Sequence, residues 1–148
     1  MSDRARRKRL GRVQEVWEGD FDKCVLALNE ARGRADAAQA LLEEARARTR
    51  VARSAKADLV NGGSADEWAA REAWLMTCGI REEKAVIARS VADRAVQEAQ
   101  AAVVVATQKI ERLKLVIARL ARGDAADARR AERVIEDEAA ARMSRGSS

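Results

Sequence analysis

The sequence of 148 residues contains no histidine, no proline and no tyrosine, and only two cysteines. Without histidine, the usual general base and the commonest metal ligand are both missing. The cysteines, Cys24 and Cys78, form no CxxC pair and are too few for a thiolate metal site. The segment Asn61-Gly62-Gly63-Ser64 lacks the lysine that a phosphate-binding loop needs. We therefore expect no enzymatic activity, no cofactor, no metal site and no small-molecule substrate.

The sequence also has no long apolar run. The longest run, Ala101–Ala106, has six residues, whereas a membrane-spanning helix needs about 20. The basic start of the chain is not followed by the apolar segment of a secretion signal, because Gln14, Glu15 and Glu18 interrupt it. Two isolated cysteines are typical of a protein kept in a reducing compartment. The sequence thus predicts a soluble, cytoplasmic protein.

The composition and the spacing of apolar residues indicate long helices. Charged residues make up 36% of the chain and aromatic residues only 3%, which is typical of exposed helices with a thin apolar seam. From residue 10 onward, apolar and small residues recur at alternating steps of three and four, which predicts a coiled-coil helix over about residues 3–60. The members of this stripe are Leu10, Val13, Trp17, Phe21, Cys24, Leu28, Ala31, Ala35, Ala38, Leu42, Ala45, Thr49, Ala52, Ala55 and Leu59.

A turn and a second helix follow. Gly62 and Gly63 are a good helix end, and Ser64 with Glu67 forms a capping box that starts the next helix. We expect the turn at residues 61–64, the second helix over about 65–142, and a frayed tail at 143–148. The apolar stripe predicted for this helix consists of Ile80, Ile87, Val91, Ala95, Ala99, Ala102, Ala106, Ile110, Leu113, Ile117 and Leu120.

These elements predict an all-α fold in a single domain, a long two-helix antiparallel coiled-coil hairpin whose second helix is longer than the first. Gly79 and the pair Gly123-Asp124 are the expected weak points of the second helix. Because this helix is the longer one, the segment after about Arg122 is expected to lack a partner helix. The acidic run Glu136-Asp137-Glu138 splays around the helix axis, so we do not expect it to bind a metal ion.

The net charge of +5 is concentrated in the first twelve residues. Such an arm either contacts nucleic acid, an anionic membrane or an acidic protein surface, or is simply a solvated helix start. No aromatic side chain lies between its basic residues and the rest of the chain is neutral on balance, which disfavours nucleic acid. The arm contains one acidic residue, Asp3, and six basic residues: Arg4, Arg6, Arg7, Lys8, Arg9 and Arg12.

Two further segments are candidates for binding. Just past the turn, Trp74 and Met76 are expected to point away from the seam that Trp68 and Leu75 share. An exposed tryptophan there is either an interface hot spot or a cover over a thin seam. The C-terminal segment 122–145 carries mixed charge over a weak apolar stripe, and such a helix is either solvated or ordered against a partner.

This layout resembles the FliJ/YscO family, the stalk proteins of flagellar and virulence-type type III secretion systems. Members of that family are chains of about this size with two long helices, a turn at about this place and a longer second helix. The resemblance spans nearly the whole chain, and architecture carries more of it than any single motif. The matching sequence features are the basic start, Asn61-Gly62 followed by Trp68, Trp74, Gln108-Lys109-x-Glu111-Arg112-Leu113, and Asp137-Glu138.

The resemblance implies a function and a set of partners. A family member inserts its joined N- and C-terminal end into the hexameric export ATPase, and its turn-proximal part faces the cytoplasmic domain of the export gate membrane protein. Some members also bind export chaperones. The protein is thus expected to lie in the cytoplasm, peripheral to the membrane-embedded export apparatus. That apparatus is either flagellar or an injectisome, and the resemblance favours the injectisome slightly.

The same resemblance assigns residues to the two ends. The ATPase-facing end comprises the basic arm together with Arg129, Arg130 and Arg133. In the family the first helix carries aromatic side chains on the gate-facing surface, where this chain has Ala47 and Val51. The gate- or chaperone-facing surface comprises Ala47, Val51, Trp68, Trp74, Met76 and Cys78.

Two other functions compete with this one. The first is a structural or scaffolding coiled coil unrelated to secretion, which predicts concentration-dependent association and no ATPase partner. The second is a nucleic-acid-binding helical arm, which predicts an affinity that falls steeply with salt through the N-terminal arginines.

Overall fold

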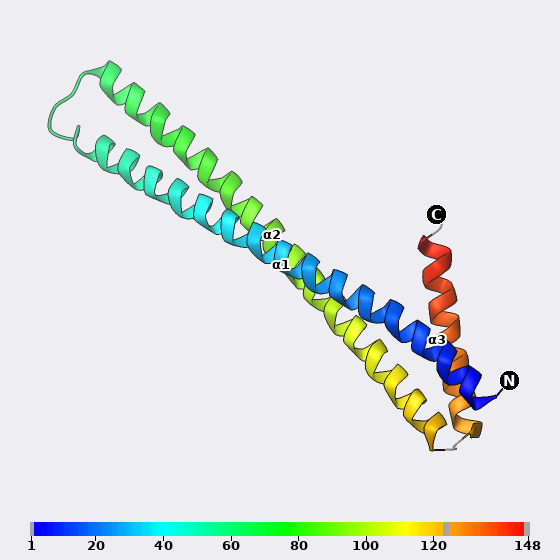
Figure 1. Cartoon of the computed structure of the whole chain (residues 1–148). Helices are drawn as coiled ribbons and strands as arrows, with labels where there is room; N and C mark the ends of the chain where they lie inside the picture. Colours follow the sequence, from blue (N-terminus) through cyan, green and yellow to red (C-terminus); the bar gives the residue numbers. More distant parts are fainter. Residues whose placement is uncertain (1, 123–124, 147–148) are drawn as a thin grey trace. The chain divides into compact units, whose positions relative to one another are not determined.

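The computed structural model describes residues 2–122 and 125–146, and for residues 125–128 it describes the backbone only. This part of the chain contains three helices and no strand, so the all-α prediction is confirmed. They are α1 (Asp3–Ala57), α2 (Ala65–Ala121) and α3 (Ala125–Gly146), coloured in sequence order in Figure 1. The chain divides into two compact units, unit 1 (Met1–Leu26 and Gln100–Ser148) and unit 2 (Ala27–Ala99).

Helix α1 follows the sequence pattern closely. It begins where Ser2 Oγ accepts a hydrogen bond from the Ala5 amide at 3.2 Å, which satisfies one of the free amides of the first turn. Every member of the stripe predicted between residues 10 and 59 is buried or half-buried. The buried members are Leu10, Trp17, Leu28, Ala31, Leu42, Thr49, Ala52 and Leu59.

The turn between α1 and α2 covers residues 58–64, so it includes the predicted residues 61–64 and begins three residues earlier. Helix α1 ends at Ala57, and Leu59 lies buried within the turn. A Cβ atom at Gly63 would lie only 2.9 Å from Leu59 Cδ2, so glycine permits this close approach. Ser64 Oγ then accepts a hydrogen bond from the Glu67 amide at 3.2 Å, and α2 begins at Ala65 as the capping pattern predicts.

In unit 2, the apolar stripe predicted for the second helix is wrong at its three large residues, whereas its members Ala95 and Ala99 are half-buried. Ile80, Ile87 and Val91 are exposed. The residues of α2 that face α1 are instead Cys78, which is buried, and a half-buried row at the same heptad spacing that includes Ala85. The reason is that α2 carries apolar residues on two opposite faces, and the alanine-rich stripe of α1 packs against the face with the smaller side chains. Gly79 does not interrupt α2.

In unit 1, the second helix does not run on to residue 142. Helix α2 ends at Ala121, α3 begins at Ala125, and α3 packs against the first part of α1 and the last part of α2. The segment after Arg122 therefore has partner helices, contrary to the prediction from helix lengths. The expected weak point Gly123-Asp124 lies outside the described residues. The buried cluster of this unit is formed by Leu10, Trp17, Ile110, Leu113, Val116, Leu120 and Ile135.

The physical reason for this third helix lies in side-chain size. In unit 1 the seam between α1 and α2 carries tryptophan, leucine and isoleucine in place of alanine, and these side chains need cover from a third element. Helix α3 supplies it and stays helical to Gly146, so the fraying expected from residue 143 does not occur up to that residue. Residues 147 and 148 lie outside the described part of the chain.

Candidate protein-binding surfaces

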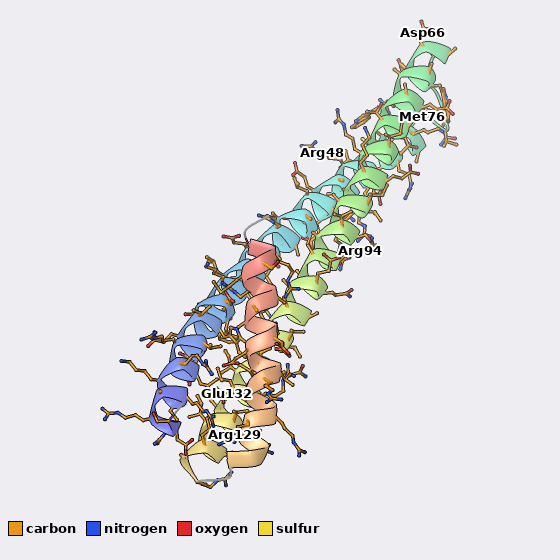
Figure 2. The ribbon with its side chains drawn as sticks, turned by 90° about the vertical axis from the view of Figure 1, so that its right-hand side faces the viewer. Arg48, Asp66, Met76, Arg94, Arg129 and Glu132 are labelled. Atoms are coloured by element: carbon orange, nitrogen blue, oxygen red, sulfur yellow. The ribbon has the colours of Figure 1, made fainter. Side chains whose placement is uncertain are left out.

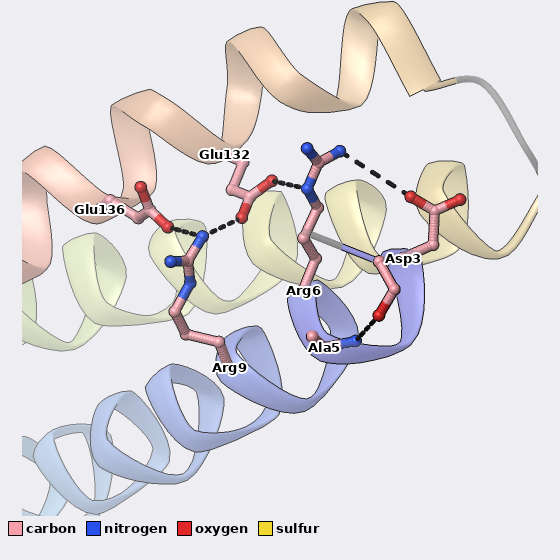
Figure 3. Close-up of polar contacts among 7 residues, drawn as sticks. Asp3, Ala5, Arg6, Arg9, Glu132 and Glu136 are labelled. Carbon is pink, nitrogen blue, oxygen red and sulfur yellow. Dashed lines mark hydrogen bonds and ion pairs between the residues drawn. The ribbon is translucent and has the colours of Figure 1, made fainter.

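A buried carboxylate joins the N-terminal arm to α3 in unit 1. Glu132 is 4% exposed, and its Oε1 atom accepts a hydrogen bond of 2.6 Å from Arg9 Nη2. Its Oε2 atom lies 3.9 Å from Arg6 Nε, and Arg6 in turn lies 3.8 Å from Asp3. Figure 3 shows Arg6 and Arg9 extending from α1 toward Glu132. Because a buried charge is tolerated only when it is paired, these contacts fix how α3 sits on the start of α1.

The acidic run at residues 136–138 also makes ion pairs. Glu136 pairs with Arg9, and Glu138 lies 3.4 Å from Arg112 of α2. The hydrogen bond from Arg9 to Glu132 raises the pKa of the Arg9 guanidinium above its ordinary value, so Arg9 stays charged. No group of histidine, cysteine, aspartate or glutamate side chains suited to a metal ion occurs among the described residues. The run therefore contributes to helix packing.

A second contact holds the far end of α3. Arg142 donates to both carboxylate oxygens of Asp20, with Nη2 at 2.5 Å from Oδ1. Fork-like pairs of this kind have a defined geometry as well as favourable charge. Asp20 and Arg142 also line a pocket with Trp17, and Lys109 lies over the Trp17 ring at 5.9 Å from its centre. The pocket has no arrangement of groups that suggests a reaction.

The basic residues assigned to the ATPase-facing end fall into two groups in the structure. Arg6 and Arg9 contact Glu132 as described above. The others are exposed and lie on the first turns of α1 and on α3. The contacts of Glu132 join these two helices. Figure 2 shows Arg129 and Glu132 on the same helix, and of these two only Glu132 is buried. We call the exposed set the cationic surface: Arg4, Arg7, Lys8, Arg12, Arg129, Arg130 and Arg133.

The residues assigned to the gate-facing surface all lie in unit 2, and they are unequally accessible. Val51, Trp74 and Met76 are exposed. Ala47 and Trp68 are half-buried, and the Trp68 ring lies 6.0 Å below the ammonium group of a lysine in α1. Cys78 is only 3% exposed because it faces α1, so it belongs to the seam and not to a surface. Both cysteines are free thiols.

The sequence pattern did not predict the contacts of Glu132 with Arg9 and of Asp20 with Arg142. The segment 122–145 alternates in charge, and alternation alone does not say which carboxylate is buried. The sequence did contain one signal. Glu132 lies three residues before Ile135, so it shares a helix face with this large apolar residue of α3. Asp20 carries no such signal, because its partner lies 122 residues away in sequence.

Comparisons with known proteins add nothing to this assignment. No protein-family model matches the chain. Neither curated proteins nor solved structures give a significant match. None of the described helices contains a stretch long and apolar enough to cross a membrane.

Proposed function

We propose that this protein is the central stalk of a type III protein export apparatus. Helices α1 and α2 form one antiparallel coiled-coil hairpin, and the unit that joins the chain's two ends inserts into the hexameric export ATPase. The protein is not itself an enzyme. It works in the cytoplasm, peripheral to the membrane-embedded export apparatus, and promotes assembly and activity of the ATPase.

The observation that carries this proposal is the joining of the N-terminal arm to α3 in unit 1. The ATPase-binding end inferred from the family resemblance needs both ends of the chain together. The contacts of Glu132 with Arg6 and Arg9 hold them together on three packed helix segments. The same contacts leave seven basic side chains exposed as the cationic surface. Exposed basic side chains attract an acidic partner and raise the rate of association.

The mechanism is allosteric. A single asymmetric stalk inside a ring of six identical subunits makes a different contact with each of them. Each contact stabilises one conformation of the subunit that makes it, which biases the order of ATP hydrolysis around the ring. The export gate meets unit 2 through the exposed side chains Val51, Trp74 and Met76. Export chaperones are a further class of partner for the same surface.

The test is the ATPase rate and hexamer yield of the export ATPase from the same organism, with and without this protein. We expect stimulation that saturates near one copy per hexamer. A chain truncated after Arg122 lacks α3, and we expect it to lose stimulation while circular dichroism shows that α1 and α2 remain helical. Normal stimulation by the truncated chain would exclude insertion through the joined ends.

A charge-reversal variant tests the cationic surface without removing α3. The triple substitution of Arg129, Arg130 and Arg133 by glutamate should abolish stimulation or make it strongly salt-dependent, because it reverses the charge presented by α3. Its matched control is a triple substitution by glutamate of three exposed arginines in unit 2, Arg32, Arg34 and Arg50. Equal loss in both variants would point to net charge and not to this surface.

The alternative is a scaffolding coiled coil without an ATPase partner. Complete lack of binding to the export ATPase, with a folded full-length chain, would leave this function. An affinity for nucleic acid that disappears on deletion of residues 2–12 would instead support the helical-arm function.

A further inference from the structure

Helix α3 lies in unit 1 on a surface that α1 and α2 form together, and we call this surface the α3 groove. The buried residue Ile135 of α3 belongs to the same cluster as Trp17 of α1 and Leu113 of α2. The buried carboxylate of Glu132 accepts a hydrogen bond of 2.6 Å from Arg9 of α1. A helix that fills the α3 groove must therefore supply a carboxylate and, three positions later, a large apolar residue.

Ion pairs along both edges of the α3 groove fix the direction of the helix in it. On the α2 edge, Glu138 lies 3.4 Å from Arg112. On the α1 edge, near the end of α3, Arg142 donates hydrogen bonds to both carboxylate oxygens of Asp20. A reversed or shifted helix would lose these pairs. The structure thus shows which occupant the groove selects, namely a helix with the charge order of α3.

The apolar faces of α2 and α3 also share one phase. Helix α2 ends at Ala121 and α3 begins at Ala125, so the connection between them is short. In one continuous helix at about 100° per residue, Ala131 would lie at the same angle as Leu113, and Ile135 within about 40° of it. All three residues face the buried cluster. A helix that only folds back on its neighbour does not need this common phase.

We propose that α3 exchanges between two copies of this chain. In the exchanged dimer, α3 continues in the direction of α2 and lies in the α3 groove of the second copy, whose own α3 lies in the groove of the first. Each groove keeps the contacts that it has in the folded-back chain, and a two-fold axis relates the copies.

The common phase of α2 and α3 is a requirement of this dimer. One side of the long helix must face the cluster of its own copy along α2 and then the groove of the second copy along α3, and the two-fold axis places both on the same side. The exchange does not rest on the proposed stalk function, which the ATPase assay tests separately.

The contacts of α3 are the same in both forms, so the connection and the protein concentration decide between them. A short connection gives α3 an effective concentration in the millimolar range for its own groove. We therefore expect the folded-back monomer in dilute solution and the exchanged dimer as the concentration approaches ~1 mM. Because α3 must leave its groove before it can exchange, joint refolding from urea is the way to bring the two forms to equilibrium.

Salt distinguishes this dimer from one that is held together by ion pairs. Arg6 and Arg9 contact the first half of α3, so the exchanged dimer brings the beginnings of both α1 helices close to the two-fold axis. The exposed side chains of Arg4, Arg7 and Lys8 repel their counterparts there. The ion pairs along the α3 groove contribute equally in both forms. Raising the salt concentration should therefore increase the fraction of dimer, and a dimer that salt dissociates would contradict the exchange.

Cross-linking of mixed chains tests the exchange directly. Both natural cysteines are first replaced by alanine. Arg112→Cys and Glu138→Cys are then placed on separate chains, which are unfolded and refolded together at ~1 mM. Only exchange brings these two positions side by side, so a short bis-maleimide should link the mixed chains into a covalent dimer.

Each of the two cysteine variants refolded alone is the control for cross-linking. It should give little product, because the two copies of either position lie ~39 Å apart along the exchanged dimer at 1.5 Å per residue. Absence of product from the mixture would refute the exchange. Equal product from each variant alone would also refute it, because the copies would then meet through another surface.

Charge reversal tests whether the natural contacts hold the exchanged helix. Asp20→Arg on one chain and Arg142→Asp on a second chain each leave like charges facing at the end of the α3 groove. Exchange between the two variants restores opposite charges in both grooves. Native mass spectrometry of the refolded mixture should therefore show the mixed dimer about tenfold above the dimer of either variant with itself.

The matched control is an ion pair that the exchange leaves within one chain. Arg46 of α1 lies 3.8 Å from Glu82 of α2 in unit 2. A refolded mixture of Arg46→Glu and Glu82→Arg should show mixed and unmixed dimers in a random ratio. A random ratio in the mixture of Asp20→Arg and Arg142→Asp would overturn the proposal, because those charges would then not meet between copies.

Discussion

Two neighbouring residues of α3, Val134 and Ile135, provide a sharp test of the packing in unit 1. Ile135 is 4% exposed and belongs to the buried cluster with Leu10 and Leu113. Val134 is 53% exposed. Replacing a buried isoleucine by alanine costs about 2 kcal/mol or more, because apolar contact is lost and a cavity remains. Replacing an exposed valine by alanine changes stability by less than ~0.5 kcal/mol.

The effect should appear first in α3. This helix of 22 residues is held at one edge of the cluster, so it can open while the rest of the unit stays folded. A loss of 2 kcal/mol corresponds to a change of about thirtyfold in the opening equilibrium. Hydrogen exchange read by mass spectrometry should therefore show that amides in α3 lose protection about thirtyfold in Ile135→Ala. Amides of unit 2 should keep their protection.

Val134→Ala is the matched control, since it replaces the adjacent residue, and valine, like isoleucine, is a β-branched residue of similar helix propensity. It should leave the protection of α3 within about twofold of the natural chain. Equal protection in the two variants would show that burial of Ile135 does not hold α3. The three-helix packing of unit 1 would then be wrong, and the helix after residue 125 would be free as its charge pattern alone allows.

The remaining predictions concern the turn and the helix interiors. Gly63→Ala should lower the midpoint of thermal unfolding, because its Cβ would lie 2.9 Å from Leu59 Cδ2. Gly33→Ala is the control, because Gly33 lies inside α1 and a Cβ atom there would meet no atom within 4 Å. It should raise stability by up to ~1 kcal/mol, since alanine has a higher helix propensity than glycine. Ser64→Ala removes the acceptor of the Glu67 amide and should lower stability by ~1 kcal/mol, measured by urea unfolding. Unchanged midpoints in Gly63→Ala and Ser64→Ala would contradict the turn geometry.

The local elements of this protein could be predicted because their signals are local. The alternating steps of three and four in α1 placed every buried residue of that helix correctly. The adjacent glycines and the capping serine located the turn and the first residue of α2. Among the candidate site residues, the exposure of Trp74 and Met76 followed from their positions relative to Trp68 and Leu75. In each case the controlling interaction joins residues within a few positions of one another.

Two features could not be predicted this way. Helix α2 in unit 2 has two apolar faces of similar pattern, and periodicity does not say which of them meets α1. Packing decides, because the alanine-rich stripe of α1 accepts the face around Cys78 and leaves Ile80 and Ile87 exposed. Similarly, length alone suggested that residues after 122 would be unpartnered, whereas the buried cluster around Leu113 recruits α3.

The sequence by itself therefore determined the helical class, the stripe of α1 and the position of the turn. Those features depend on backbone propensity and on contacts between residues near one another in the chain. Only the tertiary structure decided that Glu132 is buried against Arg9 and that Arg142 pairs with Asp20. These pairs join residues more than 120 positions apart, so their energy exists only once three helix segments have packed together.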